Sequence, residues 1–216
     1  MSHQDFEKYA KERLMNGAVA ENYKEYFFKF IDYNNNNLKV LDIGCGDGKY
    51  FNFFKHFFKE ENIFGTEISR IRVERCKNKG WRKIYLIKKM EKLPFSDKYF
   101  DLINYDQVIE HIPKEEIHFY LKEMKRILKK DGKLILMTPN YPIKRLYDFL
   151  NVLLKRDLKR IFDDPTHVTY YNFKRLNNVL KKQFSCVELY PTGGIFYKYF
   201  KKNFWSHKII SICIKT

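Results

Sequence analysis

Two spacings of hydrophobic residues alternate along the chain. Short runs rich in Val, Ile, Leu and Phe are separated by longer stretches in which apolar residues recur at three- and four-residue steps. The short runs are typical of β-strands and the longer stretches of amphipathic helices. The runs that predict strands are 38–43, 63–66, 84–87, 100–105, 133–138, 185–190 and 209–214. Because strands alternate with helices, the pattern predicts an α/β fold, with a mostly parallel sheet and helices on both faces.

Three helices can be placed from their end signals and apolar stripes. Pro113 predicts a helix start, and Asp131-Gly132 predicts its stop after a stripe of Ile117, Leu121, Met124 and Leu128. A stretch over 48–59 places Phe51, Phe54 and Phe58 on one face, which we expect to pack against the sheet. Asn172 is a good N-cap for a helix over 173–182.

The chain of 216 residues is long enough for one complete core, and no repeat or change of composition marks a boundary. We therefore expect a single domain over 1–216. Residues 1–33 are predicted to form helices before the first strand. Residues 143–162 and 193–206 are predicted to be cap insertions.

A glycine-rich turn follows the first predicted strand, in the sequence VLDIGCGDG over 40–48. Gly44, Gly46 and Gly48 would let a ligand lie against bare main chain at a helix N-terminus. Asp42 precedes the turn and would attract a positive group. Glu67 ends the next strand about twenty residues later, where a carboxylate can accept both hydroxyls of a ribose. The GxGxG spacing differs from the GxGxxG turn that holds a pyrophosphate, which disfavours an NAD-dependent oxidoreductase.

The sequence resembles the class I methyltransferases, in particular the broad group of ubiquinone and menaquinone biosynthesis enzymes. The resemblance covers roughly residues 38–190 and follows four segments in order. They are VLDIGCGDG over 40–48, EKLPF over 91–95 with FDLI over 100–103, QVIEHI over 107–112, and LKKDGKLILMTPN over 128–140. It implies a Rossmann-like, seven-stranded, mostly parallel sheet whose last strand is antiparallel, and S-adenosylmethionine as cofactor.

The resemblance also implies roles for individual residues around the cofactor. Four residues of the turn would line its methionine and ribose part: Gly44, Cys45, Gly46 and Gly48. Asp42 would lie near the ammonium group, and Glu67 would hold the ribose. Ile68 and Met90 would flank the adenine.

Further positions after the third and fourth predicted strands bear on the same resemblance. Many relatives carry an aspartate where this chain has Lys89, which makes Glu91 or a main-chain group the predicted adenine contact. Asp106 and Gln107 would face the sulfonium. His111 has two interpretations, a contact to cofactor or substrate and a side chain that bonds nearby backbone.

Methyl transfer is an in-line displacement that requires positioned reactants and excluded water, and that scheme needs no metal. An oxygen or nitrogen acceptor can require a base, for which His167 is the candidate. A loop-fixing role for His167 is the alternative. Tyr170 and Tyr171 are candidates for lining the acceptor pocket, with hydrophobic packing as their alternative role.

Charge and cysteine content set limits on partners and compartment. The formal charge of +16 would attract anionic partners, but many scattered lysines can equally be a solvated surface. The four cysteines form no CxxC pair, which indicates neither a metal site nor a disulfide framework and favours a reducing cytoplasm. No apolar run approaches the roughly 18 residues of a membrane span, and no signal-type core is present at the N-terminus.

The acceptor is not specified by these patterns. The stretches 143–162 and 196–205 combine apolar or aromatic residues with lysines and arginines, which suits an anionic membrane surface, RNA, or plain cap helices. The chain has Asn104-Tyr105-Asp106-Gln107 where base-amine methyltransferases carry (N/D)PP(Y/F). A small-molecule or lipid-like acceptor is therefore the leading hypothesis. An RNA methyltransferase and a non-catalytic methyltransferase-like binding subunit remain the alternatives.

Overall fold

The computed structural model describes residues 3–15, 17–155 and 164–216. Its strands form one seven-stranded sheet in the order β3-β2-β1-β4-β5-β7-β6. The strands are β1 Val40–Ile43, β2 Ile63–Glu67, β3 Ile84–Leu86, β4 Phe100–Asp106, β5 Leu128–Pro139, β6 Cys186–Thr192 and β7 Lys208–Ile214. Strand β1 pairs in parallel with β2 and β4, β2 pairs in parallel with β3, and β6 and β7 pair antiparallel. The predicted α/β class and the antiparallel end of the sheet are confirmed.

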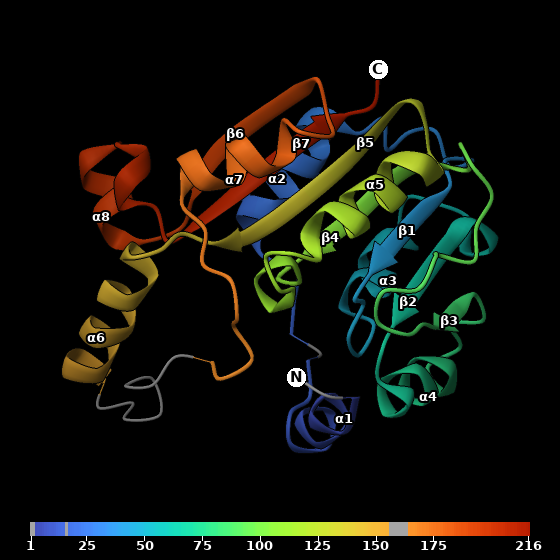
Figure 1. Ribbon diagram of the computed structural model, residues 1–216, viewed down its shortest axis with the longest axis horizontal. Helices are drawn as coiled ribbons and strands as arrows, with labels where there is room; N and C mark the ends of the chain where they lie inside the picture. Colours follow the sequence, from blue (N-terminus) through green and yellow to red (C-terminus); the bar gives the residue numbers. More distant parts are fainter. Residues whose placement is uncertain (1–2, 16, 156–163) are drawn as a thin grey trace. The chain divides into compact units, whose positions relative to one another are not determined.

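Helices and short 3-10 turns connect these strands (Figure 1). The α-helices are α1 His3–Glu12, α2 Glu21–Phe30, α3 Lys49–Phe54, α4 Arg70–Asn78, α5 Ile117–Ile127, α6 Ile143–Lys155, α7 Phe173–Leu180 and α8 Ile195–Phe200. The 3-10 turns are η1 Glu60–Asn62, η2 Ile109–His111 and η4 Asn203–Trp205. Two of these helices, α1 and α2, precede the first strand.

The chain divides into two compact units. The first contains Met1–Tyr105 with Arg126–Lys133, and the second contains Asp106–Lys125 with Leu134–Thr216. The single domain over 1–216 therefore stays a prediction, and the two units are described separately.

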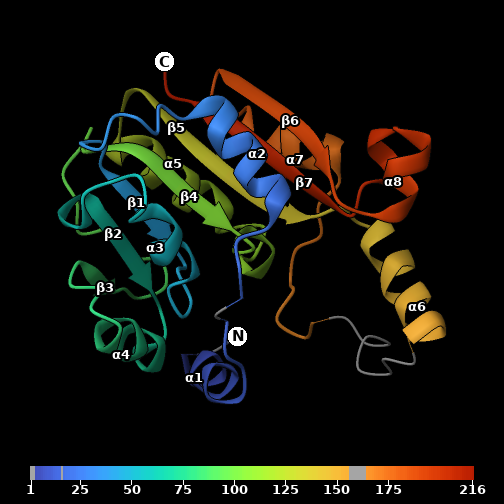
Figure 2. The ribbon, with the colours of Figure 1, turned by 180° about the vertical axis from the view of Figure 1, so that it is seen from behind.

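Aromatic side chains build the core of the first unit between α2 and α3, which lie side by side in Figure 2. Phe51, Phe54 and Phe58 are buried, as their spacing predicted. From α2, the Phe27 ring packs on Phe54 at a centroid distance of 5.9 Å. Burial of such large rings supplies much of the energy that holds a helix against its neighbours.

The packing around β2 explains a glycine in the middle of that strand. The Trp81 ring is buried, stacks on Phe51 at 4.9 Å, and donates from Nε1 to the carbonyl of Ile63 at 3.0 Å. A Cβ at Gly65 would lie 2.5 Å from a carbon of this ring. Gly65 thus lets the indole lie flat on the strand that leads to Glu67.

Helix α5 is shorter than its apolar stripe predicted. The helix begins at Ile117, after a turn that follows Pro113, and ends at Ile127. Leu128 keeps the helical spacing and is buried, but it already belongs to β5. The predicted helix extended too far because Leu128 is buried in the strand as it would be in a helix. The spacing of buried residues cannot distinguish these two cases.

Helix α3 likewise covers only part of the predicted 48–59, whereas α7 begins where predicted. Asn172 is its N-cap, and the side chain accepts from the Arg175 N–H at 2.9 Å. The cap satisfies one of the backbone donors that a helix start leaves without an intrahelical partner.

In the second unit, α6 meets α8 and η4 through Tyr147. Its hydroxyl donates to the Trp205 carbonyl at 3.0 Å and accepts from the Phe196 N–H at 2.8 Å. The two predicted cap insertions therefore contact one another. Residues 156–162 of the first insertion lie outside the described residues. Within the described residues, no helix is long and apolar enough to cross a membrane.

Candidate functional site

The glycine turn of the first unit has the backbone conformation that its sequence predicted. Gly44, Gly46 and Gly48 have φ values of 68°, 57° and 83°, in the left-handed region that favours glycine. The N–H groups of Gly44 and Cys45 both donate to the Thr66 carbonyl, at 2.8 and 3.1 Å. The turn is therefore fastened to the end of β2 by its own main chain.

Glu67 fastens the turn from the other side. Its Oε2 accepts from the Gly46 N–H at 2.9 Å, and its Oε1 accepts from the N–H groups of Ile68 at 2.8 Å and Ser69 at 3.0 Å. The residue is only 4% exposed. A carboxylate offers about four lone-pair sites, so three of them serve the backbone and one at Oε2 can still accept from a hydroxyl. The side chain predicted to hold a ribose is thus also a structural tie.

Asp42 belongs to a buried polar network in the first unit. Its Oδ1 accepts from the Asn104 amide at 2.7 Å, and the Asn104 oxygen accepts from the Tyr23 hydroxyl at 2.8 Å. The network joins β1, β4 and α2. The sequence indicated Asp42 but not the other two residues of the network. Asn104 lies 62 positions from Asp42, and Tyr23 lies 81 positions from Asn104.

The segment after α1 lies against the glycine turn. The Met15 N–H donates to Asp47 Oδ2 at 2.6 Å, and the Arg75 guanidinium donates to Asp47 Oδ1 at 3.2 Å. A Cβ added at Gly46 would lie 3.6 Å from the Met15 Cβ. Met15 of the N-terminal region therefore lies next to the predicted cofactor site, and no sequence motif indicated this contact.

Helix α1 contacts α4, and the two helices are adjacent in Figure 1. Glu7 accepts from the Ser69 hydroxyl at 2.9 Å and from the Arg70 N–H at 2.6 Å. A carboxylate at a helix N-terminus is favoured by the helix dipole and by the unpaired N–H groups there. The sequence offered no signal for this cap because Glu7 is more than 60 residues away.

A hollow of about 760 Å³ opens in the first unit between the N-terminal segment and α3. Its walls include Gly17, Val19, Phe28, Asp47, Lys49 and Phe53. Asp47 thus contributes both to this hollow and to the glycine turn.

Two buried thiols lie beside the turn. Burial raises the pKa of Cys45, with smaller contributions from a hydrogen bond to Cys76 and from the charges of Asp42 and Glu67. Cys76 approaches the Gly46 carbonyl at 3.4 Å. All four cysteines are free thiols, in agreement with the absence of a predicted disulfide framework.

The residues expected at the adenine follow Glu67 and β3 in the first unit. Ile68 is half-buried, whereas Met90 and Glu91 are exposed. Met90 has a φ of 56°, and Glu91 accepts from the Lys88 N–H at 3.1 Å. Their contact with an adenine stays a prediction.

In the second unit, Asp106 ends β4 and Gln107 follows it with a φ of 57°. The Gln107 N–H donates to the Met137 carbonyl at 2.8 Å, and both residues are half-buried. Their predicted approach to a sulfonium stays a prediction as well.

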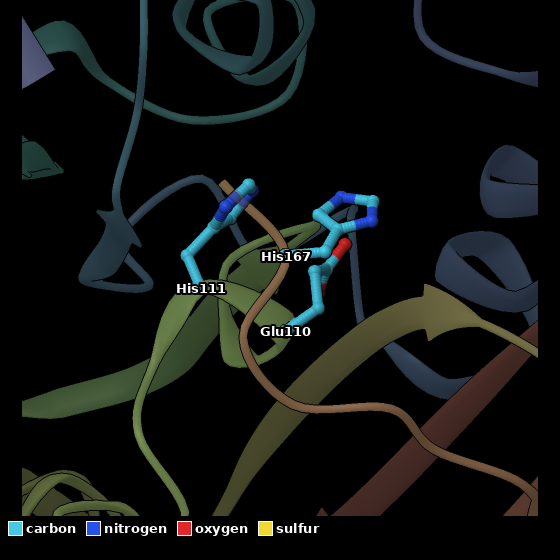
Figure 3. Close-up of side chains that lie close together, drawn as sticks. All are labelled: Glu110, His111 and His167. Atoms are coloured by element: carbon cyan, nitrogen blue, oxygen red, sulfur yellow. The ribbon is translucent and has the colours of Figure 1, made fainter. Parts of the chain in front are cut away.

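His111 and His167, predicted separately, lie together with Glu110 (Figure 3). One donor atom from each of the three lies within 4.8 Å of the others. Two backbone bonds hold the two segments together, because the N–H groups of Val168 and Thr169 donate to the Glu110 carbonyl at 2.9 and 3.0 Å.

Glu110 is the residue of this cluster that sequence reasoning missed. It is fully buried, its Oε2 accepts from the Thr138 hydroxyl at 3.0 Å, and its Oε1 has no hydrogen-bond partner. Burial raises the pKa of this carboxyl to about 8. Its position next to His111 in the QVIEHI segment was a signal, but a buried glutamate cannot be told from an exposed one by sequence.

Each histidine of the cluster has a polar neighbour at Nδ1. His111 Nδ1 lies 3.1 Å from the Thr166 carbonyl and 2.9 Å from its hydroxyl. Both interpretations of His111 stay predictions, because Nε2 could still contact a ligand. His167 Nδ1 lies 2.7 Å from the Tyr141 hydroxyl.

The two adjacent tyrosines differ in environment. Tyr171 is buried, its hydroxyl has no hydrogen-bond partner, and burial raises its pKa. Tyr170 is 45% exposed and packs edge-on against Tyr141 at 4.7 Å. Burial of Tyr171 is compatible with a packing role, and Tyr170 is accessible from solvent; the predicted contact of either with an acceptor stays a prediction.

Comparisons with known proteins agree with this fold. Residues 41–136 match the family model described as a methyltransferase domain. An uncharacterised protein of Methanocaldococcus jannaschii is 37% identical over 141 residues, which are 63% of this chain and 56% of that protein. A ubiquinone biosynthesis O-methyltransferase of Pelagibacter ubique is 29% identical over 141 residues, which cover 63% and 53% of the two chains. The chain thus spans about half the length of these curated relatives.

Among solved structures, a SAM-dependent methyltransferase from Archaeoglobus fulgidus has the same fold, with a TM-score of 0.65 at 20% identity over 90% of this chain and 94% of the other. S-adenosylmethionine is the cofactor that the family and these neighbours imply. Residues 41–136 thus match a methyltransferase domain in sequence, and the fold of the chain is that of S-adenosylmethionine-dependent methyltransferases of known structure.

Proposed function

We propose that this protein transfers a methyl group from S-adenosylmethionine to a small-molecule or lipid-like acceptor by in-line displacement, in the cytoplasm. The observation that carries the proposal is the bare glycine turn of residues 44–48, held in place by the buried carboxylate of Glu67. A turn with fixed geometry loses little conformational entropy when a ligand binds to it.

The chemistry of the turn fits the cofactor. Gly44, Gly46 and Gly48 leave main chain without side chains, Glu67 retains acceptor capacity for a ribose hydroxyl, and Asp42 supplies negative charge for an ammonium group. When bound, S-adenosylmethionine supplies a methyl group activated by positive sulfur. The protein then has to hold the two reactants in line and exclude water.

A proton must leave an oxygen or nitrogen acceptor, and His167 is the proposed base. When its Nδ1–H donates to the Tyr141 oxygen, Nε2 carries the lone pair that can accept a proton. Tyr141 would then orient the ring. Exposed Tyr170, which packs on Tyr141, is the proposed acceptor contact.

Calorimetry with S-adenosylmethionine and with its demethylated product tests the cofactor half of the proposal. We expect both to bind with one site per chain. A protein that binds neither would instead be a non-catalytic subunit with this fold. A screen of candidate acceptors, read as release of the demethylated product, then tests the transfer.

Exposed apolar side chains in the second unit support a lipid-like acceptor. Phe149 and Leu153 on α6 and Phe200 on α8 are exposed, as is Phe204 of η4. Lys201 and Lys202 follow Phe200 in the sequence and are exposed as well. An apolar surface with adjacent cations is the pattern of peripheral binding to anionic lipid.

Co-sedimentation with phosphatidylcholine vesicles, with and without phosphatidylserine, tests this surface. We expect binding only to the anionic vesicles, and a loss of binding in Phe149→Ser/Phe200→Ser. The matched control is Phe28→Ser, which changes an exposed phenylalanine of the first unit. Equal binding by both variants would contradict the proposal, and binding to RNA homopolymers but not to vesicles would favour an RNA acceptor.

A further inference from the structure

The cluster of Glu110, His111 and His167 combines one carboxylate and two imidazoles, which is a ligand set of divalent transition metals. Zinc accepts such ligands at about 2.0–2.2 Å, so a tetrahedral site requires donor atoms about 3.4 Å apart. The three donor atoms lie within 4.8 Å of one another. They would have to approach by at most about 1.4 Å, a shift that side-chain rotation can supply.

The carboxylate of Glu110 is an independent indication of a ligand. Its Oε1 is buried and has no hydrogen-bond partner, although Oε2 is oriented by the Thr138 hydroxyl. In Figure 3 the carboxylate is directed toward the His167 ring. A buried polar oxygen without a donor costs about 1–3 kcal/mol, and a cation at this point would remove that cost.

Hydrogen bonds determine which nitrogen of His111 can bind a cation. The Thr166 hydroxyl donates to Asp164 Oδ1 at 2.6 Å, so the same oxygen accepts from His111 Nδ1. The Thr166 carbonyl, which can only accept, also faces Nδ1. The proton of the neutral ring is therefore on Nδ1, and the lone pair is on Nε2.

This arrangement is the one found behind metal-bound histidines, which donate their second N–H to a carbonyl or carboxylate-linked group. Tyr141 takes the corresponding position at Nδ1 of His167. The backbone bonds from Val168 and Thr169 to the Glu110 carbonyl fix the spacing of the two segments before any ligand arrives. The supporting shell of a site is thus present.

We propose that Glu110, His111 and His167 bind one divalent transition-metal cation, with the zinc type favoured over magnesium or calcium. Magnesium and calcium prefer oxygen ligands, whereas imidazole suits zinc, cobalt, nickel and iron. Three protein ligands leave a coordination position for water or for an oxygen of a bound molecule. In the cation-bound form Nε2 of His167 is a ligand, so its role as a base belongs to the metal-free form.

Titration of the chelator-treated protein with Co²⁺, followed by its visible absorption, tests the site without any methyl acceptor. We expect one Co²⁺ per chain, displaced by Zn²⁺. His167→Ala and Glu110→Gln should each weaken binding by at least about 100-fold, and Tyr141→Phe by roughly 10- to 100-fold as a supporting residue. The matched control is His118→Ala, which removes a histidine of α5 outside the cluster and should leave affinity within about twofold.

Circular dichroism and calorimetry with the demethylated cofactor are run on every variant. Glu110→Gln keeps the shape and an acceptor oxygen for Thr138, so it tests the site even if the histidine variants do not fold. Absence of stoichiometric Co²⁺ binding by the folded wild-type protein overturns the proposal, as does an unchanged affinity in both His167→Ala and Glu110→Gln. A protein that binds Co²⁺ but no cofactor would refute the proposed function and leave the cation site standing.

Discussion

Replacing Glu67 by Gln changes one atom of the side chain and tests how the glycine turn is held. The carboxylate accepts three backbone N–H groups, two at Oε1 and one at Oε2. A glutamine has one acceptor oxygen and one NH₂ donor. In its better orientation the amide oxygen keeps the bonds from Ile68 and Ser69, and the NH₂ group then faces the Gly46 N–H.

The cost follows from that geometry. One charge-assisted hydrogen bond is lost, the remaining two become neutral, and two donors face one another in a buried site. A hydrogen bond to a charged group contributes about 1.5–3 kcal/mol, so we expect the free energy of unfolding to fall by about that amount. If the turn must be in place before the cofactor binds, the same energy weakens cofactor affinity by roughly 10- to 150-fold.

Urea unfolding measures the first effect and calorimetry with the demethylated cofactor measures the second. Glu74→Gln is the matched control, because Glu74 is an exposed residue of α4 whose carboxylate pairs with the Lys77 ammonium group at 3.2 Å. We expect it to change stability by less than about 0.5 kcal/mol. Equal stability and equal cofactor affinity in the two variants would refute the role assigned to Glu67.

Three further substitutions or modifications test the packing. Gly65→Ala places a methyl group against the buried Trp81 ring and should destabilise the fold by about 1–3 kcal/mol in urea unfolding, whereas Gly17→Ala, which meets nothing within 4 Å, should not. A Gly65→Ala protein as stable as the Gly17 control would show that the ring moves freely. Asn172→Ala removes the α7 cap and should lower the unfolding free energy by about 0.5–2 kcal/mol, and Asn172→Ser should restore most of it. The raised pKa of Cys45 keeps it a thiol at pH 8, so a disulfide reagent should modify it only after unfolding. The pKa of Cys45 is higher in the folded than in the unfolded protein. Its contribution to stability is therefore complete below the unfolded thiol's pKa and is lost as the pH rises toward the folded pKa. Rapid labelling of the folded protein at pH 8 would contradict the burial of Cys45.

Local patterns were sufficient for the elements and for the first part of the site. Each predicted strand is present, because a buried strand leaves a continuous apolar run between turn residues. The glycine turn was recognisable because only glycine adopts its backbone angles without cost. The end of α5 was placed wrongly, since Leu128 is buried in either conformation.

Pairings between distant segments were decided only by the tertiary structure. The Glu7 cap on α4, the Asn104 bridge from Asp42 to Tyr23, and the meeting of Glu110 with His167 each join residues more than 50 positions apart. Sequence spacing carries no information about such distances, because the chain between the partners can be folded in many ways. The sequence by itself therefore determined the fold class and the glycine turn of residues 44–48. Only the tertiary structure decided that Glu67 and Glu110 are buried, with Glu67 bonded to the glycine turn and Glu110 to Thr138. The physical reason is that burial removes water, so polar atoms need partners within the protein.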